Sequence, residues 1–188
     1  MAQKRYPNSP LQNLLLLTTS TAGHSTQREA VRSLLRWKFG EKGEVIAHHE
    51  SGRPFLPLIP EVEISISHCP TDVAVLLGPR LRRIGVDVET KHAQAERLKE
   101  RFCTPEELRL SRETGLPPIL IWCAKEACYK AFSDKVKEPY PGIRVTAWDK
   151  ENGTLNVRIE DEGLFCPRFK TLPGGALIVV FDEKRRCD

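Results

Sequence analysis

The sequence lacks a hydrophobic segment long enough to cross a membrane. Its longest aliphatic run extends from Leu14 to Leu17, whereas a helix that spans a bilayer needs about 20 consecutive apolar residues. The run is not followed by the small-residue cleavage site of a signal peptide. We therefore expect a cytoplasmic protein with no membrane partner.

Closely spaced cysteines are also missing. The six cysteines include no Cys-x-x-Cys pair, which argues against a structural zinc site. A disulfide framework is not expected either, because the chain has 188 residues and no export signal is evident. The sequence therefore predicts reduced cysteines that mostly serve packing.

Aromatic residues and excess charge are both scarce. Aromatic residues make up 7% of the chain, and the formal net charge is +4. These values leave few rings on which bases could stack and too little positive charge for a dedicated nucleic-acid-binding protein. We expect no nucleic-acid partner, whereas a clustered positive charge would suit an acidic protein partner.

The order of the predicted elements indicates an α+β protein with two lobes of similar size. One helix begins after Thr26, which forms a capping box with Glu29, and ends at Gly40. Gly78-Pro79 and Asn152-Gly153 are expected to form hairpin turns. The other predicted elements are strands at 44–48, 61–67, 72–77, 81–89, 143–148, 154–160 and 176–181, and helices at 92–102, from 104 onward and at 119–132.

Asp87 and Glu89 are the first candidates for chemistry. Alternate residues of a strand face the same side, so the two carboxylates would point the same way, about 7 Å apart along the strand. They would repel each other unless a cation lay between them, and hard oxygen ligands favour Mg²⁺. An exposed strand face with two solvated acids explains this segment equally well.

A second candidate lies in the predicted helix at 119–132. Trp122, Glu126 and Lys130 are four residues apart and share one helix face. Glu126 could complete a three-carboxylate metal site with the two strand acids, and Lys130 could hold phosphate oxygens. Lys125 projects to an adjacent side. The alternative is an ordinary Glu–Lys helix pair that adds a few tenths of a kcal/mol.

Two further sets of polar residues could contact phosphate. Ser67 and His68 lie at a strand end before a turn, where functional residues often occur. No Gly-x-Ser-x-Gly elbow surrounds the serine, so a hydrolase triad is not supported. The alternative for His68 is a hydrogen bond to a nearby carbonyl. The other set is cationic, and a solvated helix face is its alternative interpretation: Arg28, Arg32, Arg36 and Arg53.

Together these segments resemble the 4′-phosphopantetheinyl transferase family. The family signature is a Gly-x-Asp-x-Glu strand followed by a Trp-Ser-x-Lys-Glu-x-x-x-Lys helix, and the chain has Gly85–Glu89 and Trp122–Lys130 in that order. The sequence departs from the family pattern at Cys123 and Cys69, which replace serines, and at Arg53, where lysine is common. Three more segments resemble family motifs: Ser51-Gly52-Arg53-Pro54, Ile66-Ser67-His68-Cys69 and Phe102-Cys103-Thr104-Pro105-Glu106-Glu107.

The resemblance implies two pseudo-symmetric lobes, each a small antiparallel sheet packed with helices. Residues 1–83 would form the lobe on the coenzyme A phosphate and adenine side, and residues 84–188 the lobe with the metal-binding and catalytic motifs. The Asp-x-Glu motif lies in the middle of the chain. This position is similar to that in the larger, surfactin-synthetase-activating branch, whose members are monomers.

The implied activity is transfer of the 4′-phosphopantetheine arm of coenzyme A to a serine of an apo acyl or peptidyl carrier protein, with release of 3′,5′-ADP. Mg²⁺, or Mn²⁺ in its place, would be bound by Asp87, Glu89 and Glu126. Catalytic roles are implied for Asp87, Glu126 and Lys130, with Glu126 as the candidate general base. The surface around residues 92–113 is expected to bind the carrier protein. Contacts with coenzyme A are implied for Arg36, Arg53, Ser67, His68, Lys125 and Lys130.

Two other functions remain open at this stage. The Asp-x-Glu segment followed by a distant Lys-Glu resembles, in outline, the carboxylate sites of Mg²⁺-dependent phosphodiester enzymes such as nucleases. A non-catalytic homologue that binds coenzyme A would keep the same fold. Such a homologue is expected to have lost a carboxylate or the lysine of the signature, and all of these are present here.

Overall fold

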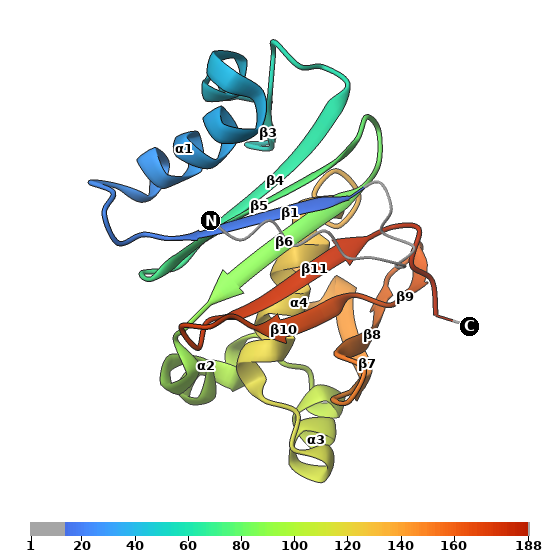
Figure 1. The fold of residues 1–188 in the computed structure, drawn as a ribbon. Helices are drawn as coiled ribbons and strands as arrows, with labels where there is room; N and C mark the ends of the chain where they lie inside the picture. Colours follow the sequence, from blue (N-terminus) through green and yellow to red (C-terminus); the bar gives the residue numbers. More distant parts are fainter. Residues whose placement is uncertain (1–13, 188) are drawn as a thin grey trace.

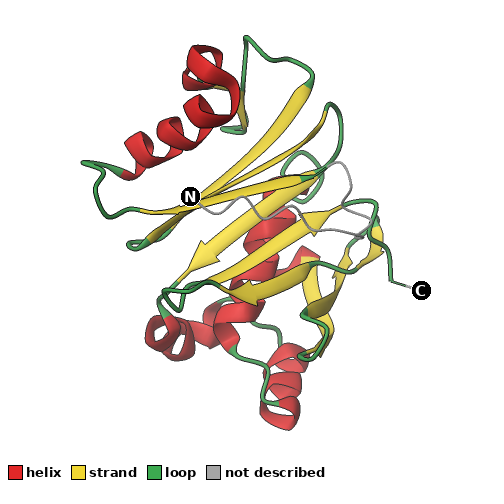
Figure 2. Ribbon diagram, in the orientation of Figure 1, coloured by secondary structure: helices red, strands yellow, loops and turns green. Residues whose placement is uncertain are grey.

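Two antiparallel sheets packed with helices make up the fold (Figures 1 and 2), which confirms the predicted α+β class. The computed structural model describes residues 14–187. The first sheet has the strand order β1-β5-β4-β3-β2, and the second has the order β6-β11-β10-β8-β7, with β9 paired to β8. The strands are β1 (Leu15–Ser20), β2 (Ala47–His48), β3 (Pro54–Phe55), β4 (Val62–His68), β5 (Asp72–Pro79), β6 (Ile84–Glu89), β7 (Ile143–Asp149), β8 (Thr154–Ile159), β9 (Gly163–Phe165), β10 (Arg168–Thr171) and β11 (Leu177–Asp182). The α-helices are α1 (Gln27–Phe39), α2 (His92–Leu98), α3 (Pro105–Thr114), α4 (Pro118–Phe132) and α5 (Pro139–Gly142), with 3₁₀ turns at Gly40–Glu44 and Lys99–Arg101.

Helix α1 packs on one face of the first sheet (Figure 1) through the apolar side predicted from its periodicity. Its buried residues meet apolar side chains of β1, β4 and β5, among them Leu17, Ile64 and Val75. Burying this surface is the main source of stability for a helix of this length. The buried helix residues are Ala30, Val31, Leu34 and Leu35.

The ends of α1 agree with the prediction except in one contact. Thr26 is the N-cap residue, and its hydroxyl accepts a hydrogen bond from the backbone N–H of Glu29. The Glu29 carboxylate, however, accepts from the backbone N–H and the hydroxyl of Ser25 instead of returning to Thr26. The reciprocal capping box predicted here is therefore wrong. Gly40 ends the helix with φ of 65°, as expected for a glycine cap.

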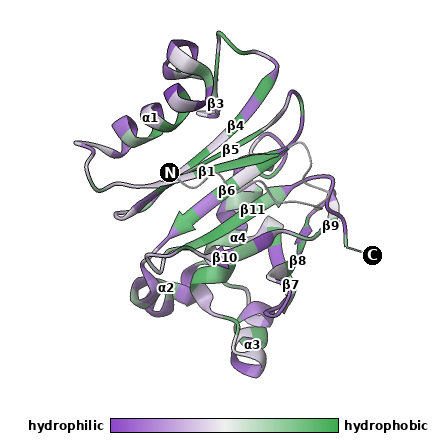
Figure 3. Ribbon diagram, viewed as in Figure 1, coloured by the Kyte–Doolittle hydropathy of each residue, from purple (hydrophilic) through white to green (hydrophobic). Residues whose placement is uncertain are grey.

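Helix α4 packs against β6 and β11 of the second sheet and supplies the largest core cluster. Three rings meet in this core: Phe132 of α4 lies 5.5 Å from both Phe165 and Phe181, measured between ring centroids. A hydrophobic stretch along β11 is visible in Figure 3. Gly85 lets β6 approach the helix closely, because a Cβ atom at this position would lie 1.8 Å from the carbonyl oxygen of Ala127.

A third core lies between the two sheets. Leu16 and Leu76 of the first sheet meet Val86, Ile178 and Val180 of the second. The molecule is thus built in four layers, with a helix, two sheets and a second helix in that order. Strand β6 lies at the edge of its sheet but contacts two cores. Its even-numbered residues face the core between the sheets, and Gly85 faces α4.

The connection between the two sheets differs from the predicted hairpin. β5 pairs with β1 and β4, whereas β6 pairs with β11, so Gly78-Pro79 does not join two neighbouring strands. β5 instead continues through Pro79, and the chain turns at Leu81, which has a φ of 65°. At this turn the chain crosses directly from the first sheet to the second.

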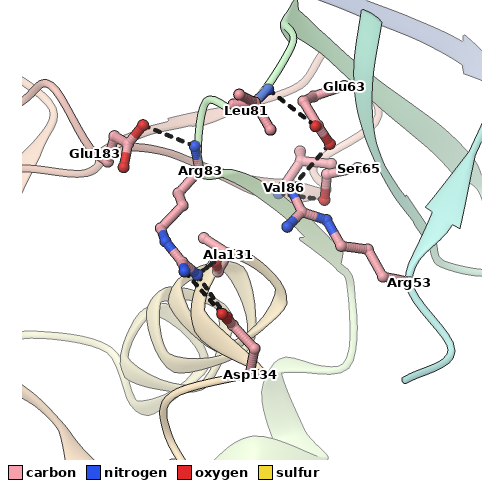
Figure 4. A network of polar contacts seen from close by, with 9 residues as sticks. All are labelled: Arg53, Glu63, Ser65, Leu81, Arg83, Val86, Ala131, Asp134 and Glu183. Carbon is pink, nitrogen blue, oxygen red and sulfur yellow. Dashed lines mark hydrogen bonds and ion pairs between the residues drawn. The ribbon is translucent and has the colours of Figure 1, made fainter. Parts of the chain in front are cut away.

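Two arginines after this turn hold it to the second sheet and α4. Arg82 is buried and forms a bidentate ion pair with Asp182 of β11, at 2.8 and 2.5 Å. Arg83 pairs with Asp134 and donates to the carbonyl oxygen of Ala131 at the end of α4 (Figure 4). The Arg82 pair fixes the start of β6 to β11, and the Arg83 contacts fix it to the end of α4.

The expected division of the chain into two lobes is not decided by the fold. The strands of the first sheet lie between residues 15 and 79, and those of the second between 84 and 182. The division into lobes at residues 83 and 84 nevertheless stays a prediction, and the first 13 residues of the proposed N-terminal lobe lie outside the described part. Within residues 14–187, no helix is both long and apolar enough to cross a membrane.

We expect Gly85→Ala to destabilise the protein strongly. The added methyl group would collide with backbone atoms of α4, so β6 and α4 would have to separate. Overpacking of this kind lowers the free energy of unfolding by about 3 kcal/mol or more, which corresponds to a fall in Tm of roughly 5 to 10 °C. Thermal unfolding followed by circular dichroism measures this change.

Gly174→Ala is the matched control. A Cβ atom there would meet only a carboxylate oxygen of Asp72, at an ordinary contact distance of 3.7 Å. We expect its Tm to stay close to that of the parent protein. Equal Tm values for the two variants would contradict the close approach of β6 to α4.

Candidate active site

Serine hydroxyl groups of β4 join the first sheet to the edge of β6. The backbone N–H of Val86 donates to Ser65 Oγ at 3.1 Å, and that of Val88 donates to Ser67 Oγ at 3.2 Å. Ser67 Oγ in turn donates to Asp87 Oδ1 at 2.8 Å. These contacts satisfy the unpaired edge of β6 and orient the Asp87 carboxylate.

Lys130 of α4 contacts the same carboxylate from the helix that packs against β6. Its ammonium nitrogen lies 2.9 Å from Asp87 Oδ1 and 3.0 Å from the carbonyl oxygen of Val86. Asp87 is 7% exposed, so the interpretation of this segment as a solvated strand face is wrong for Asp87. The lysine thus joins α4 to β6 and also reaches solvent, because its side chain remains 30% exposed.

Glu126 lies one helical turn before Lys130 and is partly buried. Its Oε1 accepts a hydrogen bond from the hydroxyl of Tyr140 at 3.1 Å. Burial, followed by the negative charge of Asp87, raises the pKa of Glu126 above its ordinary value. Burial and Glu126 together raise the pKa of Tyr140 to about 12, so this hydroxyl remains a donor at neutral pH.

Glu89 is the third predicted metal ligand. One of its oxygens accepts hydrogen bonds from the backbone N–H groups of Thr90 and Lys91, at 2.8 and 3.1 Å. Across residues 14–187, no three carboxylate, histidine or cysteine side chains are already grouped closely enough to hold a metal ion. The three predicted ligands thus lie near one another in the fold, but each carboxylate forms hydrogen bonds with different partners.

The donor set nevertheless fits a hard divalent cation. The pKa of the buried Cys123 thiol is raised by burial and then by Asp87, with a smaller contribution from Glu89, so these acids gather on one side of α4. Asp87 and Glu126 also repel each other, as the raised pKa of Glu126 indicates. Mg²⁺ usually takes one or two protein carboxylates, with water and substrate phosphates as its other ligands. A complete protein cage is not required.

A cleft of about 670 Å³ lies beside these carboxylates. Its walls come from α1, the segment from β2 through the turn to β3, β4 and the last turns of α4, so the first sheet and both large helices contribute. Lys130 lines the cleft and also contacts Asp87, which connects the cleft to the acidic cluster. The basic residues of its wall are Arg28, Arg32, His48, Arg53, His68 and Lys130.

Arg36 and Lys125 do not take the positions predicted for them. Arg36 is exposed, pairs with Glu44 at 3.3 Å and is not part of the cleft wall, since it lies beyond Arg32 at the end of α1. Lys125 is fully buried, and its ammonium bonds to Glu107 at 2.7 Å. In this structure the lysine neutralises a buried acid in the core, and its contact with a cofactor stays a prediction.

Ser67 differs from its prediction in another way. Its hydroxyl group donates to Asp87 and accepts from the backbone N–H of Val88, so it positions a carboxylate, whereas the expected contact was with coenzyme A. His68, the next residue, is exposed at the cleft, as a phosphate contact requires.

Glu63 is a site residue that the sequence analysis missed. Its Oε2 binds Arg53 at 3.2 Å and its Oε1 accepts from the backbone N–H of Leu81 at 3.0 Å (Figure 4). It thus ties the arginine of the cleft to the turn between the sheets. A signal was present: Glu63, Ser65 and Ser67 form the polar half of an alternating strand whose other side chains are Ile and Val.

The site combines a cationic cleft, an acidic cluster and a lysine between them, and comparison with known proteins places it in a family. A sequence model of the 4′-phosphopantetheinyl transferase superfamily matches residues 83–180, slightly more than half of the chain. The chain therefore belongs to the 4′-phosphopantetheinyl transferase superfamily.

Individual relatives agree with this assignment. The chain is 32% identical to enterobactin synthase component D of Salmonella austin over 137 residues, which cover 68% of this chain and 54% of the relative. It is 33% identical to the protein of the same name from Salmonella typhimurium over 100 residues, which cover 50% and 42% of the two chains. The matches thus span about half the length of these curated relatives.

We expect Glu126→Gln to raise the stability of the protein at neutral pH. Because the pKa of Glu126 is higher in the folded state than in the unfolded chain, its stabilising contribution is complete below the ordinary value of 4.5 and is lost as pH rises through the folded value. Glutamine carries no charge to bury and can still accept from Tyr140.

The measurement is Tm as a function of pH. The variant should unfold at a higher temperature than the parent at pH 7, and the two curves should converge near pH 4. Glu113→Gln, on the exposed side of α3, is the control and should show no such difference. A Glu126→Gln variant that is less stable than the parent at pH 7 would contradict the claim that burial and Asp87 disfavour the charged form of Glu126.

Proposed function

We propose that the protein transfers the 4′-phosphopantetheine arm of coenzyme A to a serine of an apo acyl or peptidyl carrier protein. One observation carries the proposal: a cationic cleft is lined by Lys130, which is ion-paired with Asp87 beside the partly buried Glu126. Membership of the 4′-phosphopantetheinyl transferase superfamily supports it. The activity, coenzyme A and the carrier protein are proposals for this chain, which spans about half of its relatives.

The charge of the cleft suits the phosphate groups of coenzyme A. Arg28, Arg32, Arg53 and His68 can bind the 3′-phosphate and the adenosine end, and Arg32 takes the place first expected for Arg36. Lys130, which also contacts Asp87, can hold the pyrophosphate. Arg53 is partly neutralised by Glu63, which keeps its side chain in place in the absence of a ligand.

The acidic cluster suits a divalent cation. Asp87, Glu126 and, after leaving its backbone contacts, Glu89 would hold Mg²⁺, or Mn²⁺ in its place. Such an ion supplies neutralising charge for the pyrophosphate and helps to orient it. Lys130 holds the Asp87 carboxylate from one side and Ser67 holds it from another, so this ligand is positioned before any substrate arrives.

The proposed reaction is a displacement at phosphorus. The hydroxyl oxygen of the carrier serine forms a bond to the phosphorus that bears pantetheine, and the bond from that phosphorus to the bridging oxygen breaks. The electron pair leaves with 3′,5′-ADP. The serine proton passes to a base, for which Glu126 is the candidate, because its raised pKa brings it closer to neutral pH. Lys130 stabilises the charge that develops on the phosphate oxygens.

The finer assignments are also proposals. We place the chain in the larger, surfactin-synthetase-activating branch because two sheets flank the site within one chain and the Asp-x-Glu motif lies mid-chain. This arrangement supports a monomer, and we expect it in the cytoplasm. The helices around residues 92–113 are proposed to bind the carrier, and exposed cations there include Arg97, Arg101 and Arg109.

The central test incubates the protein with coenzyme A, Mg²⁺ and several apo carrier proteins, followed by intact-protein mass spectrometry. We expect a mass gain of one phosphopantetheine arm, no gain in the presence of EDTA, and a loss of rate of at least about 100-fold for Asp87→Ala and Glu126→Gln. Glu126→Gln separates catalysis from folding, because it is expected to be the more stable protein. Glu151→Gln, in the exposed turn between β7 and β8 and outside the cleft and the proposed carrier surface, is the matched control for this assay.

Other outcomes would favour the alternatives. Binding of coenzyme A without modification of any carrier would support a non-catalytic homologue. Mg²⁺-dependent cleavage of plasmid DNA or RNA, lost in the Asp87 variant, would support a phosphodiester enzyme. Near-normal turnover by Glu126→Gln would overturn both the metal role and the base role of that residue.

A second test concerns the arginines. We expect Arg53→Ala to raise the KM for coenzyme A by about tenfold or more, because a charged contact to phosphate is lost, while kcat changes less. Arg36→Ala removes an arginine from outside the cleft and should change this KM by less than about threefold. Steady-state kinetics with a fixed carrier protein measures both. The reverse order of effects would restore Arg36 as the phosphate ligand.

A further inference from the structure

The end of the chain pairs with β9 on the side of the second sheet where Figure 1 places the C-terminus. Phe165 and Arg186 form an antiparallel bridge. The backbone N–H of Cys166 donates to the carbonyl oxygen of Arg185 at 2.8 Å, and the N–H of Cys187 donates to that of Leu164 at 3.4 Å. The Arg186 guanidinium also lies 4.1 Å from the centre of the Phe165 ring.

This register brings two cysteines together. Cys166 lies opposite Arg185, and Cys187 is two residues further along, so all three side chains share one face of the strand pair. The two sulfur atoms are 2.7 Å apart. Non-bonded heavy atoms usually pack at about 3.5 Å or more. Cys69, Cys123 and Cys128, in contrast, are buried in the cores.

Arg185 adds a positive charge to this pair. Burial and then the nearby Arg168 lower the pKa of its guanidinium, whereas Cys166 and Cys187 act in the opposite direction. Its Nε and Nη1 atoms are buried and have no hydrogen-bond partner among residues 14–187. A guanidinium group beside a thiol favours the thiolate, the form that attacks disulfides. The three residues therefore combine proximity with activation.

We propose that Cys166 and Cys187 form a redox-active dithiol that small-molecule disulfides, such as glutathione disulfide, convert to an intramolecular disulfide. One cysteine thiolate attacks a sulfur of the oxidant and releases one reduced glutathione. The other cysteine then attacks the mixed disulfide, forms the Cys166–Cys187 bond and releases the second. The dithiol loses two electrons and two protons, and the two glutathione thiols carry them away.

The bond would join residues 21 positions apart and fix the end of the chain to β9. Both cysteines are partly exposed, so an oxidant can reach them. Neither belongs to the cleft wall or to the acidic cluster, and the inference is independent of the proposed transferase activity. Closing a loop of this size restricts the unfolded chain, so we expect oxidation to raise Tm by roughly 5 °C.

The experiment treats the full chain with glutathione disulfide and then counts free thiols and maps linked peptides by mass spectrometry. We expect a loss of two thiols and of about 2 Da, with a single linked peptide pair containing Cys166 and Cys187. Reduction should reverse both changes. Cys166→Ser and Cys187→Ser should each abolish the internal bond, whereas Cys103→Ser, at another partly exposed cysteine, should form it normally.

Arg185→Met tests the activation step. We expect the variant to form the same bond several-fold more slowly, because the thiolate is less favoured. An unchanged rate would remove the guanidinium from the proposal. Stable glutathione adducts without an internal bond, a bond between other cysteines, or six free thiols after treatment would each overturn the proposal.

Discussion

The close contact between β6 and α4 at Gly85 is the constraint on which the site depends. Asp87 and Glu89 belong to the strand, and Glu126 and Lys130 belong to the helix. Only a residue without a side chain lets the two backbones approach as closely as they do. Because the contact lies two residues from Asp87, a change in the separation of strand and helix would directly change the distance from Asp87 to Lys130, which is now 2.9 Å.

The other side of β6 sets a second constraint. This strand lies at the edge of its sheet, so the N–H groups on that edge would be left unpaired where the two sheets meet. Ser65 and Ser67 accept from them, and a hydroxyl group can accept one hydrogen bond while donating another. Ser67 uses its donor on Asp87. The contact that joins β4 to β6 therefore also orients a carboxylate of the proposed metal site.

Much of the fold could be predicted because its strong signals are local. The apolar face of α1, the start of α3 at Thr104 and the turn at Asn152-Gly153 depend on residues close together in sequence, and the structure contains all three. β1 was missed because the run from Leu14 to Leu17 shows no alternation. The structure explains this pattern: Leu16 faces the core between the sheets, and Leu17 faces the core under α1.

The same distinction separates the predictable from the unpredictable part of the site. Helical spacing was enough to place Glu126 and Lys130 on one face, and strand alternation put Asp87 on the side of Gly85. Lys125 could not be interpreted in this way, because its partner Glu107 belongs to another helix and only the folded core brings the two together. Arg36 fits the cationic stripe by sequence, yet the cleft ends before the last turn of α1.

The arrangement of charge gives the site its direction. Arginines and two histidines line the cleft, whereas the carboxylates of the acidic cluster lie beside it, and Lys130 contacts both regions. An anionic ligand is attracted to the cleft but repelled by the acids beyond it, unless a cation neutralises them. Burial and then the charge of Asp87 raise the pKa of Glu126, so the acids already disfavour one another's charge in the absence of a ligand. A phosphate ester and a divalent cation would each make the binding of the other more favourable, and this mutual dependence is what the proposed reaction requires.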